Sequence, residues 1–67
     1  MPTVTIEGPP LTDINKKRTL AKEMTESAAK AYQLPKDVIV VVIKENLPEN
    51  VSVGGQLIID RHHDKPE

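Results

Sequence analysis

The chain has 67 residues, no cysteine and a single aromatic residue, so disulfides are excluded and the core must be built from aliphatic side chains. Its formal net charge is -1, and no basic stripe interleaves with aromatic residues, which excludes the usual nucleic-acid surface. No apolar run approaches the roughly 20 residues of a membrane helix, and the start lacks the regions of a signal peptide. We therefore expect one cytoplasmic domain over residues 1–67.

Small size predicts self-association. A domain of this length buries only about 60% of the surface that its unfolded chain exposes. Neither disulfides nor a paired Cys/His metal motif is present to compensate. We expect a homo-oligomer, in which the missing core is supplied by contacts between copies.

Pro2 stands directly after the first methionine. Removal of Met1 would turn its nitrogen into a free secondary amine, which is a proton acceptor and therefore a general base with no side chain involved. Proline occurs at any one position about once in twenty residues, so Pro2 by itself is weak evidence.

The first two predicted elements are a strand and a helix. Residues 3–7 alternate and are rich in β-branched side chains, which predicts a strand with one covered face, ended by the run 8–10. Thr12 and Asp13 are both good N-cap residues. Apolar residues then recur at helical spacing, which predicts an amphipathic helix of about five turns. These apolar positions are Leu20, Met24, Ala28 and Ala31.

A second strand is predicted after the helix. Leu34 precedes Pro35, which disfavours further helix, and residues 38–43 are then apolar without alternation, as in a strand covered on both faces. Strand, helix and strand form a β-α-β unit whose crossover makes the two strands parallel. One helix covers only one face of that sheet, so the other face is expected to pack against another subunit.

The last segments are predicted to be a hairpin and a tail. Residues 51–59 read as a short hairpin that turns at Gly54 and Gly55, where the turn needs positive φ angles. The polar segment 61–67 is expected to be loose. Its adjacent histidines would point to opposite sides of an extended segment, so no metal site is predicted there. The predicted fold class is α+β: a small β-α-β unit with parallel strands and a C-terminal β-hairpin, oligomeric.

This order of features resembles the 4-oxalocrotonate tautomerase family, from Pro2 to about Ile59 without gaps. The family's pre-strand proline falls on Pro35, the acidic residue that ends its second strand falls on Glu45, and its glycine pair falls on residues 54–55. The resemblance implies a hexamer built of dimers. It also implies that Pro2 moves a proton between carbons of a small unsaturated 2-oxo or 2-hydroxy acid, with no cofactor and no metal.

Three positions depart from the family pattern. The two arginines that hold substrate in the best-known members fall on Thr12 and Val40, and the aromatic residue of the hairpin falls on Val51. Losing a bidentate carboxylate clamp removes hydrogen bonds worth about 1.5–3 kcal/mol each, so we expect a substrate with one carboxylate instead of two. Val53 is expected among the apolar surroundings that lower the pKa of the Pro2 amine.

Two cations are candidates to replace the arginines. Lys16 lies one helical turn after Thr12 and would project from the same face, whereas Lys17 and Arg18 would point elsewhere. Arg61 would reach a neighbour's site from the end of the hairpin. Each also has a plainer interpretation, since the lysine run is typical of a solvated helix start and Arg61 of an exposed tail.

Three functional hypotheses follow. The first is a tautomerase acting on a small carboxylate substrate. The second keeps the fold and Pro2 but performs another reaction of the superfamily, such as dehalogenation or decarboxylation. The third is a non-enzymatic oligomeric module in which Pro2 is only the first strand residue. Asn50 and Ser52, near the predicted hairpin, are polar candidates without an assigned role.

Overall fold

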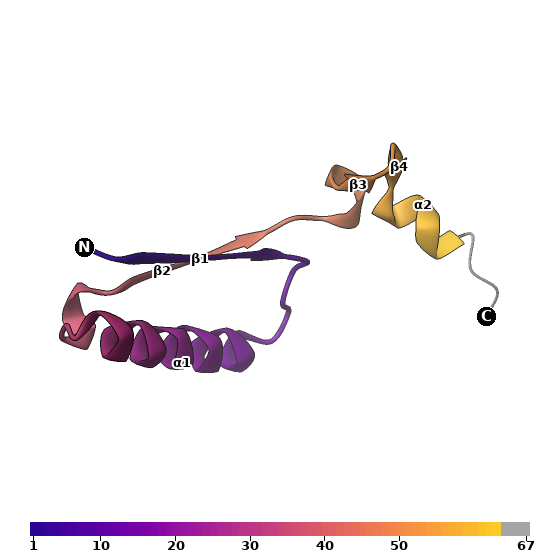
Figure 1. Ribbon diagram of the computed structural model, residues 1–67. Helices are drawn as coiled ribbons and strands as arrows, with labels where there is room; N and C mark the ends of the chain where they lie inside the picture. The colour runs from indigo at the N-terminus through magenta and orange to yellow at the C-terminus, as the bar shows by residue number, and fades with distance from the viewer. Residues whose placement is uncertain (64–67) are drawn as a thin grey trace.

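Two parallel strands and one helix form the body of the chain in the computed structural model, which describes residues 1–63 (Figure 1). Strands β1 (Thr3–Gly8) and β2 (Val40–Glu45) pair in parallel, residue for residue, along their full length. Helix α1 (Ile14–Tyr32) connects them and returns in the opposite direction. The predicted β-α-β unit with parallel strands is therefore confirmed.

Both ends of α1 are fixed by local hydrogen bonds. The Asp13 side chain accepts a hydrogen bond from the Asn15 backbone N–H at 2.9 Å, which is the expected N-cap interaction. At the other end Gln33 adopts the left-handed conformation with φ 56, and its N–H caps carbonyls of the last turn. The 19-residue helix matches the predicted five turns.

The second strand begins later than the sequence pattern suggested. The apolar run 38–43 was expected to be the strand, but a 3-10 turn (η1, Lys36–Val38) follows Pro35 and occupies its first residue. The Val38 and Ile39 N–H groups donate to carbonyls within this turn, so neither joins the ladder. Strand β2 therefore starts at Val40 and ends at Glu45.

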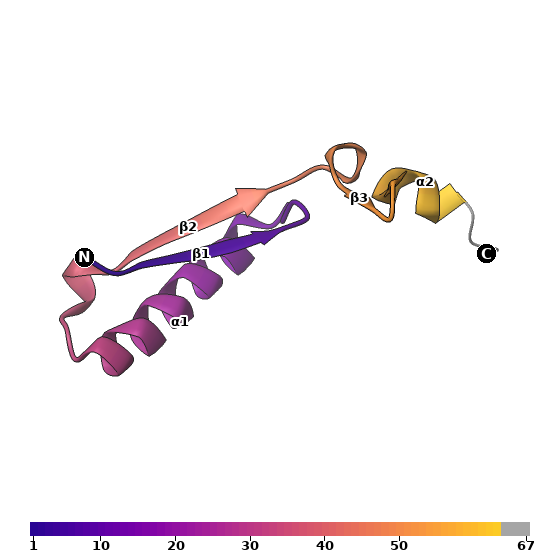
Figure 2. The same cartoon turned by 45° about the horizontal axis from the view of Figure 1, so that its top comes forward.

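Helix α1 covers one face of the two-stranded sheet and leaves the other uncovered (Figures 1 and 2). In β1 the half-buried residues alternate with exposed ones, and Val4 and Ile6 are on the covered side, opposite Val41 and Ile43. Val42 belongs to the other side and is 37% exposed. The prediction that β2 is covered on both faces is not met within one chain.

The chain continues as an arm (residues 48–63) beyond the carboxyl ends of the strands (Figure 1). A 3-10 turn (η2, Pro48–Asn50) leads into a hairpin of β3 (Ser52–Val53) and β4 (Gln56–Leu57). The hairpin turns at Gly54 and Gly55, with φ of 63 and 88, as predicted.

The end of the arm differs from the sequence prediction. The hairpin was expected to reach Ile59 and the tail to be loose from residue 61, but a helix, α2 (Ile58–His63), begins directly after β4. The Ile58 N–H donates to the Val51 carbonyl at 2.8 Å and closes the hairpin there. Ile58 and Ile59 are both half-buried, and α2 contacts η2. The helix therefore packs against η2, a contact that a longer hairpin strand would lack. Residues 64–67 of the predicted tail lie outside the described residues.

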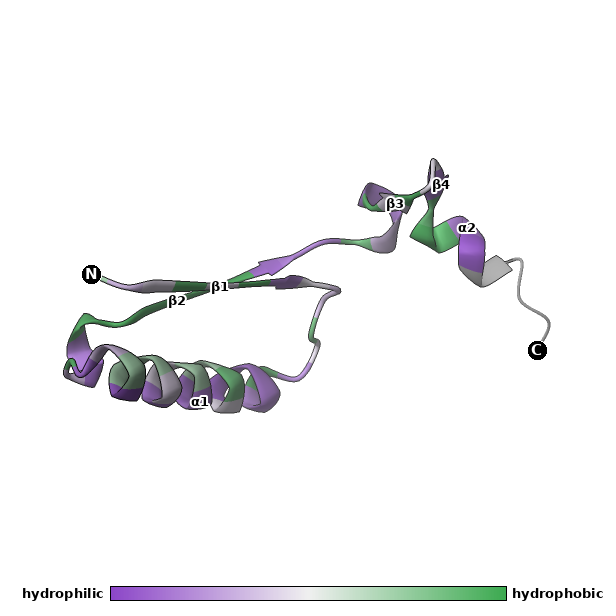
Figure 3. Ribbon diagram, in the orientation of Figure 1, coloured by the Kyte–Doolittle hydropathy of each residue, from purple (hydrophilic) through white to green (hydrophobic). Residues whose placement is uncertain are grey.

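The single chain has almost no core of its own. Its radius of gyration is 15.9 Å, against about 11 Å for a compact chain of this length. Its accessible surface is 5446 Å², whereas a folded monomer of this mass exposes about 4,200 Å². Among the described residues only Ala28 is buried. Apolar residues instead run along both strands and reappear where α2 begins (Figure 3).

Within residues 1–63, neither helix combines the length and the apolar character that crossing a membrane requires.

Candidate functional site

Pro2 is held at the amino end of the sheet. It is half-buried, and its carbonyl accepts a hydrogen bond from the Val40 N–H at 3.0 Å. Proline has no N–H to donate, so the nitrogen of Pro2 takes no part in the ladder. Two of the predicted site residues, Pro2 and Val40, are therefore neighbours within one chain.

Thr12 and Lys16 lie at the opposite end of the sheet. Helix α1 starts near the carboxyl end of β1 and runs back toward the amino end of the sheet (Figure 2). A six-residue strand is about 20 Å long, so this distance separates the two candidates from Pro2 in the same chain. Both side chains are exposed.

The remaining predicted residues belong to the arm or its base. Val51 is half-buried beside the hairpin, Val53 is 55% exposed in β3, and Arg61 is exposed in α2. The arm points away from the chain's amino terminus (Figure 1). One chain thus brings Pro2 and Val40 together and leaves the other five predicted residues apart from them.

A groove of about 780 Å³ separates the carboxyl ends of the strands from the arm. Its volume is in the range of about 300–1,000 Å³ that is usual for small-molecule pockets. The Glu7 carboxylate accepts a hydrogen bond from the Asn46 side-chain amide at 2.8 Å. The groove is lined by Glu7, Gly8, Pro9, Asn46, Pro48, Asn50, Val51, Ser52 and Ile58.

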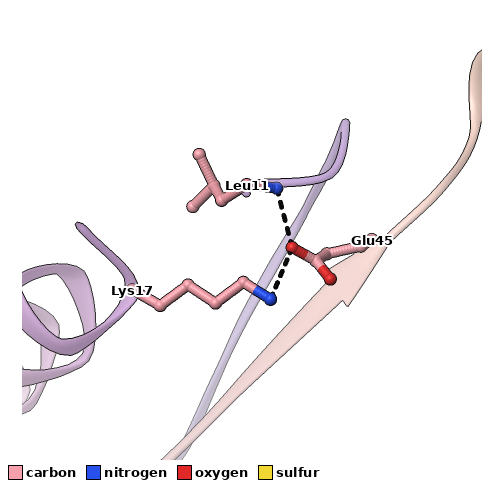
Figure 4. Close-up of polar contacts among 3 residues, drawn as sticks. All are labelled: Leu11, Lys17 and Glu45. Carbon is pink, nitrogen blue, oxygen red and sulfur yellow. Dashed lines mark hydrogen bonds and ion pairs between the residues drawn. The ribbon is translucent and has the colours of Figure 1, made fainter. Parts of the chain in front are cut away.

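A second polar cluster joins β2, the loop before α1 and the first turn of that helix (Figure 4). One oxygen of Glu45 accepts a hydrogen bond from the Leu11 N–H at 2.7 Å and lies 2.8 Å from the Lys17 Nζ. The Lys17 side chain, followed by the Leu11 N–H, lowers the pKa of the Glu45 carboxyl, because both favour the charged form. Both charged side chains are 28% exposed.

Lys17 has a partner that the sequence analysis did not assign. It was predicted to point away from the face of Thr12 and Lys16, and it faces the sheet, where it is paired with Glu45. The sequence contained the signal, since Lys17 shares a helical stripe with Leu20, Met24 and Ala28, which face the same way. Arg18 instead donates a hydrogen bond to the Asn15 side chain at 2.9 Å along the helix surface.

The Glu7–Asn46 pair is the contact that sequence reasoning missed entirely. The partners are 39 residues apart, and nothing in the local pattern links them. Only the parallel register, in which Gly8 is opposite Glu45, would bring Glu7 close to the residue that follows β2. Within residues 1–63, no three His, Cys, Asp or Glu side chains gather as a metal site would require.

Replacing Glu45 with Gln is expected to flatten the loss of stability in acid. A carboxyl whose folded-state pKa is lowered contributes stability fully above its ordinary value of 4.5, and loses it as the pH falls through the folded value. The urea midpoint of the unchanged protein should therefore fall more steeply than that of Glu45→Gln between about pH 6 and pH 3.

The matched control for this comparison is Glu23→Gln, which removes an exposed carboxylate from the outer side of α1. Its midpoint should follow that of the unchanged protein. Parallel acid profiles for the unchanged protein and Glu45→Gln would contradict the role assigned to the cluster.

A family model and several solved structures relate this chain to the same group of proteins. The sequence model of the family described as Tautomerase enzyme matches residues 2–61. The structure of DmpI from Archaeoglobus fulgidus is similar, with 41% identity, a TM-score of 0.79, and coverage of 88% of this chain and 100% of that one. DmpI from Helicobacter pylori has 26% identity and a TM-score of 0.73, covering 92% and 98%. A heterohexamer 4-oxalocrotonate tautomerase from Chloroflexus aurantiacus has 25% identity and a TM-score of 0.79, covering 90% and 97%. A search of curated proteins gave no match.

Proposed function

The chain belongs to the tautomerase family, and from this premise we propose that it is an isomerase that uses the nitrogen of Pro2 as general base and acid once Met1 has been removed. The observation that carries the proposal is the position of Pro2. The family match begins at this residue, and its carbonyl is bound by Val40 while its nitrogen makes no ladder bond.

The proposed reaction needs no second reactant. The unprotonated amine accepts a proton from the substrate, becomes an ammonium, and returns the proton at a different carbon as the double bond shifts. A free α-amino group ordinarily has a pKa of about 7.7–8.0. Apolar surroundings disfavour the ammonium, and Pro2 is half-buried at the amino end of a sheet rich in valine and isoleucine. A lowered Pro2 pKa remains our prediction.

The proposed substrate is a small unsaturated 2-oxo or 2-hydroxy acid with one carboxylate. Thr12 and Val40 offer no bidentate clamp, and Lys17 is already paired with Glu45. Lys16 is exposed in the first turn of α1 and is the cation that we assign to the single carboxylate. A lysine holds it as a point charge and does not require fork geometry.

The proposed site forms between copies of the chain, as a homohexamer built of dimers. Within one chain the length of a strand separates Pro2 from Thr12 and Lys16, and the arm carries Val53 and Arg61 farther away. The large exposed surface and the uncovered side of the sheet support association. So does the heterohexamer described for the relative from Chloroflexus aurantiacus. A cytoplasmic location and a cofactor-free reaction stay predictions.

The test is the ketonisation rate of two enol acids, phenylenolpyruvate with one carboxylate and 2-hydroxymuconate with two. The protein must be shown by mass to begin at Pro2. We expect the higher kcat/KM for phenylenolpyruvate. If neither compound is turned over by protein with a free Pro2 amine, the proposal is wrong and the resemblance is one of fold.

A further inference from the structure

The groove at the base of the arm carries one ionisable side chain, and it is an acid. Of its nine lining residues only Glu7 has an ionisable side chain, and no lysine or arginine lines it. The other polar lining side chains are amides and a hydroxyl, from Asn46, Asn50 and Ser52. These groups hydrogen-bond an uncharged oxygen but do not neutralise an anion.

Glu7 is held in place at this position. The Asn46 amide donates to its carboxylate at 2.8 Å, and the Asn46 backbone N–H donates to the Gly8 carbonyl at 2.8 Å. Asn46, which follows β2, therefore hydrogen-bonds to the end of β1 through both its backbone and its side chain. The hydrogen bond from the Asn46 amide fixes the orientation of the Glu7 carboxylate.

No cation among the lining residues offsets this carboxylate. Lys44 is the register partner of Glu7 on β2, but it does not line the groove. Along the chain that borders the groove, Glu49 lies between two lining residues, and Asp60 and Arg61 are exposed in α2 two and three residues after Ile58. Glu45, the other nearby acid, is already paired with Lys17.

We propose that Glu7, oriented by Asn46, determines substrate class by excluding a second carboxylate from the groove, which instead takes the uncharged end of the substrate. The inference rests on the proposed function. Val51, which the family resemblance makes a site residue, lines the same groove. Because Glu7 and Pro2 are at opposite ends of β1, the groove serves the Pro2 of another copy.

The test compares kcat/KM for 2-hydroxymuconate and phenylenolpyruvate in four proteins that begin at Pro2: unchanged, Glu7→Gln, Glu7→Lys and the control Glu23→Gln. Removing the carboxylate should raise the ratio of dicarboxylate to monocarboxylate turnover about fivefold, as suits a partly solvated charge pair. Glu7→Lys should raise it further, because attraction replaces repulsion. Glu23→Gln removes the same charge from the outside of α1 and should leave the ratio unchanged.

An unchanged ratio in both Glu7 variants, with phenylenolpyruvate still turned over, would overturn this inference and leave the proposed function standing. If none of the four proteins turns over either compound, the proposed function is wrong, and the role of Glu7 is then tested by ligand binding. Pyruvate and 2-oxoglutarate would then be titrated into ¹⁵N-labelled protein. Shifts at the Asn46, Asn50 and Ser52 amides, with 2-oxoglutarate binding tightened about fivefold by Glu7→Lys, would support it. Equal binding in the unchanged and Glu7→Lys proteins would refute it.

Discussion

Protein that retains Met1 is expected to have tautomerase activity lower by a factor of about 10²–10⁴ than protein that begins at Pro2, which is the usual contribution of general acid–base catalysis. The retained residue converts the Pro2 nitrogen into an amide, and an amide nitrogen does not accept a proton near neutral pH. The measurement is kcat for phenylenolpyruvate with two preparations whose masses differ by one methionine.

The Pro2→Ala variant distinguishes the contribution of the free terminal amine from that of the pyrrolidine ring. With Met1 removed it keeps a free terminal nitrogen, so it should be less impaired than the methionine-bearing protein. Equal rates for the processed and the methionine-bearing proteins would contradict the assignment of Pro2 as the base. They would direct attention to the side chains of the groove instead.

Val42→Asp is expected to break the assembly into single chains of 7.4 kDa. Val42 is 37% exposed on the side of the sheet that α1 leaves uncovered. If another copy covers this side, the new carboxylate is buried without a partner, at a cost of about 3–5 kcal/mol in each copy. Sedimentation should show the mass of an oligomer for the unchanged protein and of a monomer for the variant.

The matched control is Ser27→Asp, which adds the same charge at an exposed position of α1. It should sediment like the unchanged protein. Because a chain with so little core depends on its partners, the urea midpoint of the unchanged protein should rise with protein concentration. A stable monomer at 7.4 kDa for the unchanged protein would contradict both this prediction and any site built between chains.

The body of the fold was predictable because its signals are local. The alternation in residues 3–7, the cap at Asp13 and the helical spacing that follows are each read within a few residues, and the parallel pairing then follows from the handedness of the crossover. The glycine pair at 54–55 likewise predicts the turn of the hairpin without information from distant residues. Periodicity could not place the start of β2, because the turn after Pro35 competes for its first residues.

The arm shows where local reading stops. Ile58 and Ile59 carry the same β-branched side chains as the strands, yet they begin α2. The strands of the body have partners along their full length, whereas the hairpin closes at the Val51–Ile58 bond, and no third strand among residues 1–63 pairs with it. Tertiary contact with η2 therefore outweighs β propensity at these two residues.

Pro2 could be singled out from the sequence because its proposed chemistry needs no partner residue to be recognised. The ion pair of Lys17 with Glu45 was not predicted, because Lys17 was placed relative to Thr12 and not relative to the stripe that faces the sheet. Glu7 and Asn46 meet only through the register of the two strands. Distances between copies, on which the proposed roles of Lys16 and Arg61 depend, are set by surfaces that a single chain does not contain.

The bond between the Val40 N–H and the Pro2 carbonyl has a consequence for how preparations of this protein behave. This bond uses the carbonyl of Pro2, whereas removal of Met1 changes only its nitrogen. Proline has no backbone N–H, so no hydrogen bond of the sheet is gained or lost at that nitrogen. Processed and unprocessed chains should therefore fold alike and join the same assemblies. Specific activity would then be proportional to the fraction of subunits from which Met1 has been removed. A sample that is pure and fully folded would still contain inactive subunits wherever Met1 is retained.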